Sequence, residues 1–257
     1  MSVKIHPSAI VEKGAQLGDG VLVEAFAYIA STVSIGDATV IRHHSSVEGN
    51  TTLGKQNLVA PYACLGGLTQ DLKYKGGVVG LTIGDNNQFR EYVTVHSATM
   101  DQAKTKIGNH NVLLAYSHVA HDCVMGDYNV MSGNSALAGH VIIGNQINIA
   151  WSAGIHQFCQ IGDYAMVSAC SKVVQDILPF MIADGNPASV RAVNKIGLQR
   201  NGFSEAQIND IKEIFKELYK SGKNRTQALD FLEKRFSKNS NYDQILRFIK
   251  NSNRGLA

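Results

Sequence analysis

The chain of 257 residues lacks the features that mark secreted, membrane-spanning and disulfide-stabilised proteins. No apolar run approaches the length that crosses a bilayer, and His6 and Pro7 interrupt any apolar segment of a secretion signal. The four cysteines form no Cys-x-x-Cys pair, so they are expected to be reduced thiols in or beside the core. These absences predict a cytoplasmic protein without an integral membrane segment.

Charged residues make up only 18% of the chain, and their two signs are unevenly distributed. Residues 1–188 hold 10 Lys and Arg against 14 Asp and Glu, whereas residues 189–257 hold 14 against 7. The basic C-terminal part predicts either an anionic partner or an ordinary solvated helical face. Because no aromatic residues are interleaved with the basic ones and no nucleic-acid motif is present, DNA and RNA are not expected partners.

The sequence is rich in one pattern, an apolar residue at every sixth position. The pattern runs without interruption from Ile5 to Leu65, resumes at Ile83, and runs again from Ile107 to Val173. A helix repeats near 3.6 residues and a strand at 2, so neither alone produces a period of six. A period of six is typical of a parallel β-helix built from hexapeptides.

A second period sets the shape of the coil. Glycine follows the apolar position at Gly18, Gly36 and Gly54, and again from Gly108 to Gly162, with a spacing of 18 residues. Since 18 residues are three hexads, one coil has three sides and the prism is triangular. Most of these glycines precede Asp or Asn, a pair that is expected at a corner needing positive φ.

The repeat divides the chain into two predicted domains. Residues 1–186 form an all-β prism with loop excursions near residues 66–82 and 97–106, which are expected to gather on one face and line a binding site. Residues 187–257 form a small α-helical domain. Its expected helices cover residues 189–200, a stretch from the capping box of Ser204 and Gln207 until Gly222, residues 226–236 and residues 242–249.

The coil length brings distant residues together. Adding 18 to His121 reaches Gly139, and adding 18 again reaches Gln157, so these residues are expected to stack at one corner about 4.8 Å apart. His140 and His156 flank that column. Because the aliphatic residues fill the interior, the histidines are expected on an exposed ridge.

The segment around His121 is the most reactive part of the sequence, and its residues leave three interpretations open. Asp122 could support His121 as a general base or merely cap a turn, and Gly139 could offer an N–H to an oxyanion or serve only the turn. The first interpretation is direct acyl transfer, with His121 as the base and Gly139 as the oxyanion donor. The second interpretation is a zinc site held by His118, His121 and His140, as in carbonic-anhydrase-like hexapeptide proteins. The third is a scaffold whose ridge only docks a partner. Other polar residues favour a large anionic substrate over carbon dioxide, namely Lys73, Gln157 and Arg200.

A series of short motifs runs through nearly the whole chain. In order they are Gln70-Asp71-Leu72-Lys73-Tyr74, Thr94-Val95-His96, His118-Val119-Ala120-His121-Asp122-Cys123, Leu137-Ala138-Gly139-His140, His156-Gln157-Phe158, Asp184-Gly185-Asn186 and Gly197-Leu198-Gln199-Arg200-Asn201-Gly202-Phe203. With this ordered set and a helical tail, the chain resembles the UDP-N-acetylglucosamine 3-O-acyltransferases that begin lipid A biosynthesis. The resemblance implies a left-handed β-helix and a homotrimer with active sites in clefts between subunits. It also implies a 3-hydroxyacyl thioester of acyl carrier protein as donor, a UDP-sugar as acceptor, and no cofactor or metal.

The resemblance also implies roles for individual residues. His121 would remove the proton from the sugar 3-position, Asp122 would orient His121, and the Gly139 N–H would steady the tetrahedral oxyanion. The substrate-binding residues would be Gln70, Asp71, Lys73, His96, His118, His140, His156, Gln157, Asn194 and Arg200. The basic C-terminal domain would steer the acidic acyl carrier protein.

The chain departs from the family pattern near the nucleotide and near the acyl chain. Ser97 stands where the family often has Arg or Lys, Ile196 where it has Glu, and Asn201 where it has a second arginine. The nucleotide contacts are therefore expected to differ. Ala169 matches a position that limits acyl chain length, and Trp151 lies 18 residues before it. The two predict a short acyl pocket, unless Trp151 packs against a neighbouring subunit instead.

Two related activities stay open at this point. Some family members acylate a 3-amino sugar, and the same base and oxyanion donor serve a hydroxyl or an amine. The later N-acyltransferase of the same pathway carries an extra N-terminal domain, whereas the hexads here begin at Ile5. The sequence therefore favours the O-acyltransferase without deciding the acceptor atom or the acyl chain length.

Overall fold

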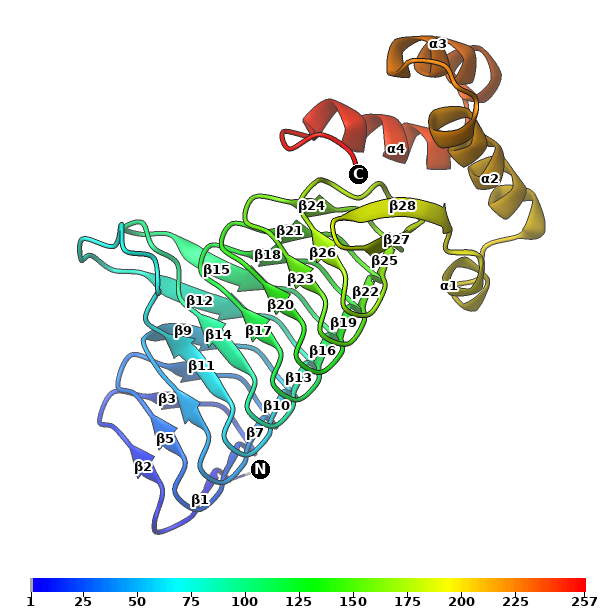
Figure 1. Ribbon diagram of the computed structural model, residues 1–257. Coiled ribbons are helices and arrows are strands. Elements are labelled where there is room, and N and C mark those ends of the chain that lie inside the picture. Colours follow the sequence, from blue (N-terminus) through cyan, green and yellow to red (C-terminus); the bar gives the residue numbers. More distant parts are fainter. Residues whose placement is uncertain (1) are drawn as a thin grey trace.

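Short strands wind into a triangular prism of stacked coils in the computed structural model, which describes residues 2–257 (Figure 1). The first of three sheets contains, in spatial order, β1 (Lys4–Ile5), β4 (Leu22–Val23), β7 (Val40–Ile41), β10 (Leu58–Val59), β13 (Gln88–Phe89), β16 (Val112–Leu113), β19 (Val130–Met131), β22 (Asn148–Ile149), β25 (Met166–Val167), β27 (Met181–Gly185) and β28 (Ala188–Val193). The second contains β2 (Ile10–Val11), β5 (Tyr28–Ile29), β8 (Ser46–Val47), β11 (Cys64–Gly67), β14 (Thr94–His96), β17 (His118–Val119), β20 (Ala136–Leu137), β23 (Gly154–Ile155) and β26 (Lys172–Val173). The third contains β24 (Gln160–Ile161), β21 (Ile142–Ile143), β18 (Val124–Met125), β15 (Lys104–Ile107), β12 (Gly80–Ile83), β9 (Asn50–Leu53), β6 (Ser34–Ile35) and β3 (Gln16–Leu17). As far as β26, each strand pairs with the strand three places along the chain, so the predicted three-sided coil is confirmed.

The interior of the prism is filled by the residues of the six-residue repeat. Val119, Leu137 and Ile155 occupy equivalent positions on three successive coils of the second sheet, where each pairs with the next. All three are at most 2% exposed, as are Ile29 and Val47 in earlier coils. Burying one such side chain stabilises the fold by about 1.5–3 kcal/mol, so the repeat supplies the core.

The recurring glycines are required by close packing between coils. The positive φ expected at this corner lies not on the glycine but two residues later, at residues such as Ala38 (φ 54°) and Tyr128 (φ 59°). A Cβ on Gly108 would collide with the side chain of Asp127 in the next coil. That carboxylate accepts the backbone N–H of Asn109 at 2.6 Å. A larger residue in place of the glycine would therefore push two coils apart.

One corner of the prism contains a buried ladder of asparagines. Asn57, Asn87, Asn111 and Asn129 occupy the same place on successive coils, and each is at most 1% exposed. Each side-chain oxygen accepts the next backbone N–H along the ladder at 2.8–2.9 Å, and the last one accepts from Ile147. Each side-chain amide donates to a glycine carbonyl at 2.9–3.0 Å. The ladder thus satisfies the polar atoms of a corner from which water is excluded.

The segment that follows the last coil differs from its prediction. A helix was expected over residues 189–200, but β28 occupies the first part of this range and pairs antiparallel with β27. Residues Ala188, Val190 and Val193 are 6–8% exposed, because the segment covers the end of the prism as an added strand. The helix begins only after Asn194, whose Oδ1 accepts the Gly197 N–H at 3.1 Å.

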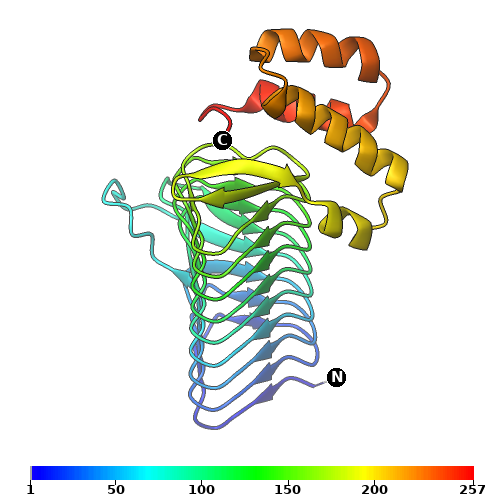
Figure 2. The same ribbon diagram turned by 45° about the vertical axis from the view of Figure 1, so that its right-hand side comes forward.

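Helices α1 (Lys195–Arg200), α2 (Glu205–Lys220), α3 (Arg225–Phe236) and α4 (Ser240–Asn251) lie beyond the last coils (Figure 2). The capping box predicted at Ser204 is present at the start of α2. The tail is bonded to the prism at Asp163, which accepts from Gln244, and at Asp176, which accepts from Ser252, both at 2.6 Å. The domain boundary at residue 186 stays a prediction. Among the residues described, no helix combines the length and the apolar character that crossing a membrane requires.

The two loop excursions lie side by side, as expected (Figure 1). The Val78 N–H donates to Asp101 Oδ1 at 2.7 Å, and the Gln102 N–H donates to the Val78 carbonyl at 2.7 Å. Closer to the prism, the hydroxyls of Thr69 and Thr99 are 2.8 Å apart. This contact brings both excursions to the edge of the second sheet.

Candidate active site

A pocket of about 480 Å³ opens over the second sheet beside the excursions. Its floor is formed by the strands β17, β20, β23 and β26, and by the corner residues that follow β17 and β20. The polar and glycine residues that line it are Gln70, His96, His118, His121, Gly139, Gly154, His156 and Lys172. Four of the nine histidines of the chain therefore lie in one pocket.

A larger hollow of about 820 Å³ lies at the opposite, N-terminal end of the prism. It is lined by Ile5, Phe26, His43 and His44, among others. Its walls are mostly apolar side chains of the first coils. Volume alone therefore does not locate the site. The smaller pocket is the candidate because burial lowers the pKa of His96 and His118 there and because His121 is paired with Asp122 at its edge.

His121 and Asp122 form a hydrogen-bonded pair at the edge of the smaller pocket. His121 Nδ1 lies 2.9 Å from Asp122 Oδ2 and 3.1 Å from the hydroxyl of Thr99. The Thr99 N–H donates to both oxygens of the same carboxylate, at 3.2 and 3.1 Å. When Nδ1 carries its proton toward Asp122, the basic nitrogen of the ring is Nε2. The pair therefore has the arrangement of a general base with an orienting carboxylate.

Asp122 stays ionised in this environment. Burial acts to raise its pKa, but the hydrogen bonds from His121 and from Thr99 outweigh burial and lower the pKa below its ordinary value. The carboxylate is only 10% exposed, and His140 Nε2 lies 3.7 Å from Oδ2. The carboxylate beside Nδ1 fixes the orientation and the tautomer of the His121 ring.

Gly139 lies against the imidazole of His121. A Cβ at this position would collide with Cε1 and Nε2 of the ring and crowd Nδ1, so only glycine fits beside His121 in this arrangement. The coils stack as predicted, because the His140 N–H donates to the His121 carbonyl at 3.0 Å and the Phe158 N–H donates to the Gly139 carbonyl at 3.2 Å. Within residues 2–257, the Gly139 N–H has no acceptor. An open amide beside a candidate base is what an oxyanion site requires.

His96 and His118 form a pair of histidines that lines the same pocket. Their rings are perpendicular with centroids 4.9 Å apart, and His118 Nδ1 lies 2.7 Å from the hydroxyl of Thr94. Burial, followed by the neighbouring His96, lowers the pKa of His118 to about 4. Burial also lowers the pKa of His96, with a further contribution from His121. Both rings are therefore neutral near pH 7, which suits hydrogen bonding to an uncharged group better than general base catalysis.

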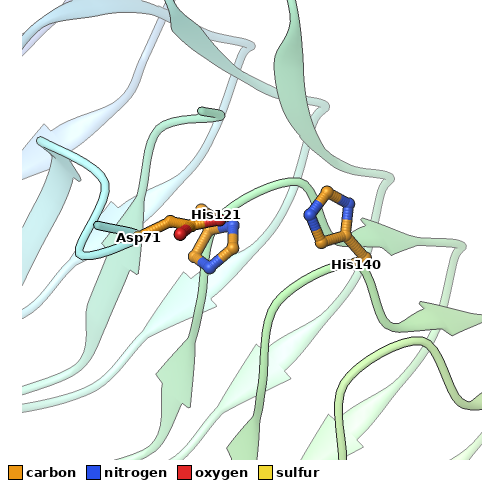
Figure 3. A group of neighbouring side chains, drawn as sticks. All are labelled: Asp71, His121 and His140. Carbon is orange, nitrogen blue, oxygen red and sulfur yellow. The ribbon is translucent and has the colours of Figure 1, made fainter. Parts of the chain in front are cut away.

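Asp71, His121 and His140 form a third group, which Figure 3 shows. Asp71 comes from the first excursion, and its carboxylate and the two imidazoles place one ligand atom each within 4.8 Å of one another. The zinc set weighed as one of three interpretations of the sequence, against an expectation of no metal, named His118 instead of Asp71. His118 is not in this group, since its ring pairs with His96 and Thr94.

Comparisons with known proteins identify the family. An acyl-(acyl-carrier-protein)–UDP-N-acetylglucosamine O-acyltransferase from Verminephrobacter eiseniae is 42% identical over 219 residues, which cover 85% of this chain and 84% of the relative. Its counterpart from Synechocystis is 46% identical over 186 residues, covering 72% of this chain and 67% of the relative. The solved UDP-N-acetylglucosamine O-acyltransferase of Moraxella catarrhalis is 40% identical over 98% of both chains, with a TM-score of 0.94. The chain belongs to the UDP-N-acetylglucosamine O-acyltransferase family.

The tail of the chain matches the same family by a separate comparison. A family model described as UDP N-acetylglucosamine O-acyltransferase, domain 2, matches residues 176–257. The fold shared with the solved structures is a left-handed parallel β-helix followed by a helical tail, as the sequence predicted. The expectation that the chain is an enzyme, an acyltransferase of this family, is also confirmed.

Two of the residues that the family resemblance assigned to substrate binding, Asn194 and Arg200, do not lie in the histidine pocket of this acyltransferase chain. Asn194 and Arg200 line a separate hollow of about 660 Å³ over the first sheet. The polar atoms of the Asn194 side chain already have hydrogen-bond partners, since the side chain caps α1 and donates to the Tyr164 carbonyl at 2.8 Å. Ile196, which is 63% exposed, and Asn201 line the same hollow. Within a single chain, the two groups of predicted residues thus stay apart.

Three other predicted positions lie at the rim of the histidine pocket or outside it. Gln157 is exposed, and its carbonyl lies 3.2 Å from His156 Nδ1. Lys73 is exposed on the first excursion, where its backbone N–H donates to Asp71 Oδ1 at 2.9 Å. Ser97 is 2% exposed and donates to the Gly66 carbonyl at 3.0 Å, so it has a structural role in the loop.

Trp151 lies on the corner at the other side of the second sheet. It is 55% exposed, and its carbonyl accepts the N–H of Cys170 in the next coil at 2.9 Å. The stacking with the coil of Ala169 is therefore as expected. Neither residue lines the histidine pocket. Their role in limiting the acyl chain stays a prediction.

Three residues in or beside the site were not predicted from the sequence. Lys172 lines the pocket and lies 18 residues after Gly154, so the same arithmetic applied to the outward strand positions finds it. Thr99 contacts both members of the dyad, and Arg254 Nη2 lies 3.3 Å from His156 Nδ1. No spacing pattern relates these last two to the prism, because they lie outside the repeat.

Proposed function

We propose that this chain transfers an acyl group from the thioester of an acyl carrier protein to the 3-position of UDP-N-acetylglucosamine. The printed names of its relatives describe this reaction for them, at 42–46% identity. The observation that carries the proposal for this chain is the contact of Gly139 with a His121–Asp122 pair, in which base and open amide are neighbours.

In the proposed reaction, His121 removes the proton from the sugar hydroxyl as its oxygen attacks the thioester carbonyl. The carbonyl oxygen becomes an oxyanion, and the Gly139 N–H stabilises it. When the tetrahedral intermediate collapses, the carbon–sulfur bond breaks and the proton on His121 passes to the departing thiolate. Asp122 keeps the ring oriented and stabilises the imidazolium, so no covalent intermediate on the enzyme is required.

The low pKa of His118 supports His121 as the base. A group that titrates at about pH 4 is a weak base at neutral pH, where the most effective catalytic group titrates near the pH of the medium. His118 and His96 are better suited to hold the sugar by neutral hydrogen bonds. Lys172, which also lines the pocket, supplies a positive charge for an anionic substrate.

We also propose that the chain forms a homotrimer and that its basic tail attracts the acyl carrier protein. A homotrimer, with each site in a cleft between subunits, would bring the hollow of Asn194 and Arg200 on one chain toward the histidine pocket of another. The excess of 14 basic over 7 acidic residues in residues 189–257 fits an acidic acyl carrier protein. Light scattering tests the trimer, and the salt dependence of the Michaelis constant for the donor tests the steering.

The deciding experiment is an assay of the purified chain with a mixed pool of acyl carrier proteins and two acceptors. Product masses should show one acyl group on UDP-N-acetylglucosamine, and chains shorter than the longest in the pool should be preferred because of Trp151 and Ala169. Faster acylation of the 3-amino sugar nucleotide would show that the chain acylates the amine and not the hydroxyl. No transfer to either acceptor would refute the proposal, and preference for the longest chains would refute the short pocket.

A further inference from the structure

The group of Asp71, His121 and His140 has the composition of a site for a zinc-class metal ion. One carboxylate and two imidazoles are the donors that zinc, cobalt and nickel prefer, whereas magnesium and calcium prefer oxygen alone. The three side chains come from separate segments, the first excursion and two successive corners, and meet at the pocket edge (Figure 3). Three protein donors with an open fourth position are the usual number for an accessible zinc site.

The distances fit such an ion after small side-chain rotations. Bonds of about 2.0–2.2 Å place two donors of a tetrahedral zinc ion roughly 3.4 Å apart. The three ligand atoms here already lie within 4.8 Å of one another. His140 has 35% of its side chain exposed, and Asp71 lies in a loop and is half-buried, so neither is locked by the core.

The surroundings of the group match those of metal sites as well. A metal-bound histidine usually donates its second N–H to a carboxylate, which fixes its tautomer. His121 Nδ1 already has this contact with Asp122 at 2.9 Å, and Thr99 holds the same carboxylate. When Nδ1 is bonded to Asp122, Nε2 is the nitrogen of His121 left to take either a proton or a metal ion.

We propose that Asp71, His121 and His140 bind one zinc-class ion per chain, and that the bound ion inhibits acyl transfer. Inhibition follows because the metal takes the nitrogen that must accept the proton of the acceptor sugar, a step that rests on the proposed function. Metal binding itself depends only on the three donors. The ion is an inhibitor of the enzyme and not a cofactor, and its effect should be competitive with the sugar nucleotide.

Binding is tested first, without any assay of activity. The full chain is treated with a chelator and titrated with cobalt, whose visible absorption bands report the coordination, and with zinc by calorimetry. One ion per chain should bind to the wild type, and binding should weaken at least tenfold in Asp71→Asn and in His140→Gln. These variants retain similar shape, and circular dichroism checks that they fold.

The matched control is His43→Gln. His43 and His44 form a histidine pair outside the candidate site, with Nδ1 atoms 3.0 Å apart on the surface of an early coil. The control should leave cobalt binding unchanged. Loss of binding in the control together with retention in Asp71→Asn would overturn the proposal, as would the absence of stoichiometric binding by the wild type.

Inhibition is tested next and separates the two proposals. Zinc should reduce acyl transfer in proportion to site occupancy, magnesium should not, and a chelator should restore the rate. If the chain transfers acyl groups and stays fully active with the site saturated, the inhibitory role is refuted while the proposed function stands. If cobalt binds at these residues but no acyl transfer occurs, the proposed function fails and the metal site remains.

Discussion

Two corners of the prism repeat the same kind of turn on successive coils and treat their polar atoms in different ways. At the corner with the asparagine ladder, each of the four asparagines is at most 1% exposed, and its side-chain oxygen and amide both have partners within the fold. At the corner that carries His121, the ring borders a pocket, and the Gly139 N–H has no acceptor in residues 2–257. One corner stabilises the prism, and the other leaves hydrogen-bonding groups for a substrate. The backbone turn is of the same kind at both corners. The corners differ in the residues that occupy equivalent positions on successive coils.

The largest effect on this comparison is expected from His121→Ala. Removing a general base lowers kcat by about 10²–10⁴-fold, and the prism should remain folded because its core residues are untouched. Initial rates with UDP-N-acetylglucosamine, together with circular dichroism, check both statements. The control is His110→Asn, at an exposed corner histidine stacked on Tyr128 at 4.5 Å, which should keep its full rate. A variant at His121 with nearly normal turnover would contradict its assignment as the base.

Gly139→Ala tests the contact between the amide and the base. The new Cβ occupies the position of the imidazole, so the ring of His121 must move, and a displacement of about 1 Å can lower the rate roughly 10²-fold. The expected loss is in kcat. Gly154→Ala, one coil further in the same pocket, is the steric comparison, because its Cβ meets no atom within 4 Å. Equal losses in the two variants would show that steric displacement of His121 is not the cause.

The closed corner is expected to respond in stability and not in rate. Asn87→Ala removes the oxygen that accepts the buried Asn111 N–H at 2.8 Å, and an unsatisfied buried donor costs about 1–3 kcal/mol of unfolding free energy. Denaturant titration measures the loss, and the activity of the folded fraction should be unchanged. Asn209→Ala on the exposed face of α2 is the control, with a change within about 0.5 kcal/mol. An equal effect of both variants would mean that the ladder does not stabilise the prism.

The histidine pocket also makes stability depend on pH. The pKa of His118 in the folded state is about 4, below the value near 6.5 of an unfolded chain. A lowered histidine pKa means that the unfolded state binds more protons, so stability is complete above about pH 6.5 and falls as the pH drops toward 4. The slope is at most about 1.4 kcal/mol per pH unit. Asp122, whose pKa is lowered, stabilises the folded state at higher pH, and this contribution is lost only as the pH falls below this window.

The measurement is the free energy of unfolding between pH 4 and 7, for the wild type and for His118→Asn. The amide in the variant does not titrate but can still bond to Thr94, so its curve should be flatter than that of the wild type. Parallel curves would assign the pH dependence to other groups. His96 lines the same pocket with a lowered pKa and is expected to retain part of the slope.

The sequence could predict the parts of the molecule that obey its period. Three hexads per coil place Gly139 in the same position as His121 on the next coil, and the structure confirms that stacking. The segment of β28 was mistaken for helix, because Val190 and Val193 are compatible with either period in so short a stretch. Asp71 and Thr99 lie in excursions that leave the period, so no arithmetic could bring them to His121. Their positions depend on how two loops pack, which spacing does not encode.

The smallest effect is expected from a change at Thr99, which tests whether a residue outside the repeat supports the base. Thr99→Val keeps the shape and the N–H that bonds to Asp122, but removes the hydroxyl that lies 3.1 Å from His121 Nδ1 and 2.8 Å from Thr69. One neutral hydrogen bond is worth about 0.5–1.5 kcal/mol, so kcat should fall roughly 3- to 10-fold. The Michaelis constant for the sugar nucleotide should not change, because Thr99 acts through His121 as a positioning residue. Thr99→Ser should restore the rate, whereas equal losses in both variants would mean that the methyl group, and not the hydroxyl, supports the base.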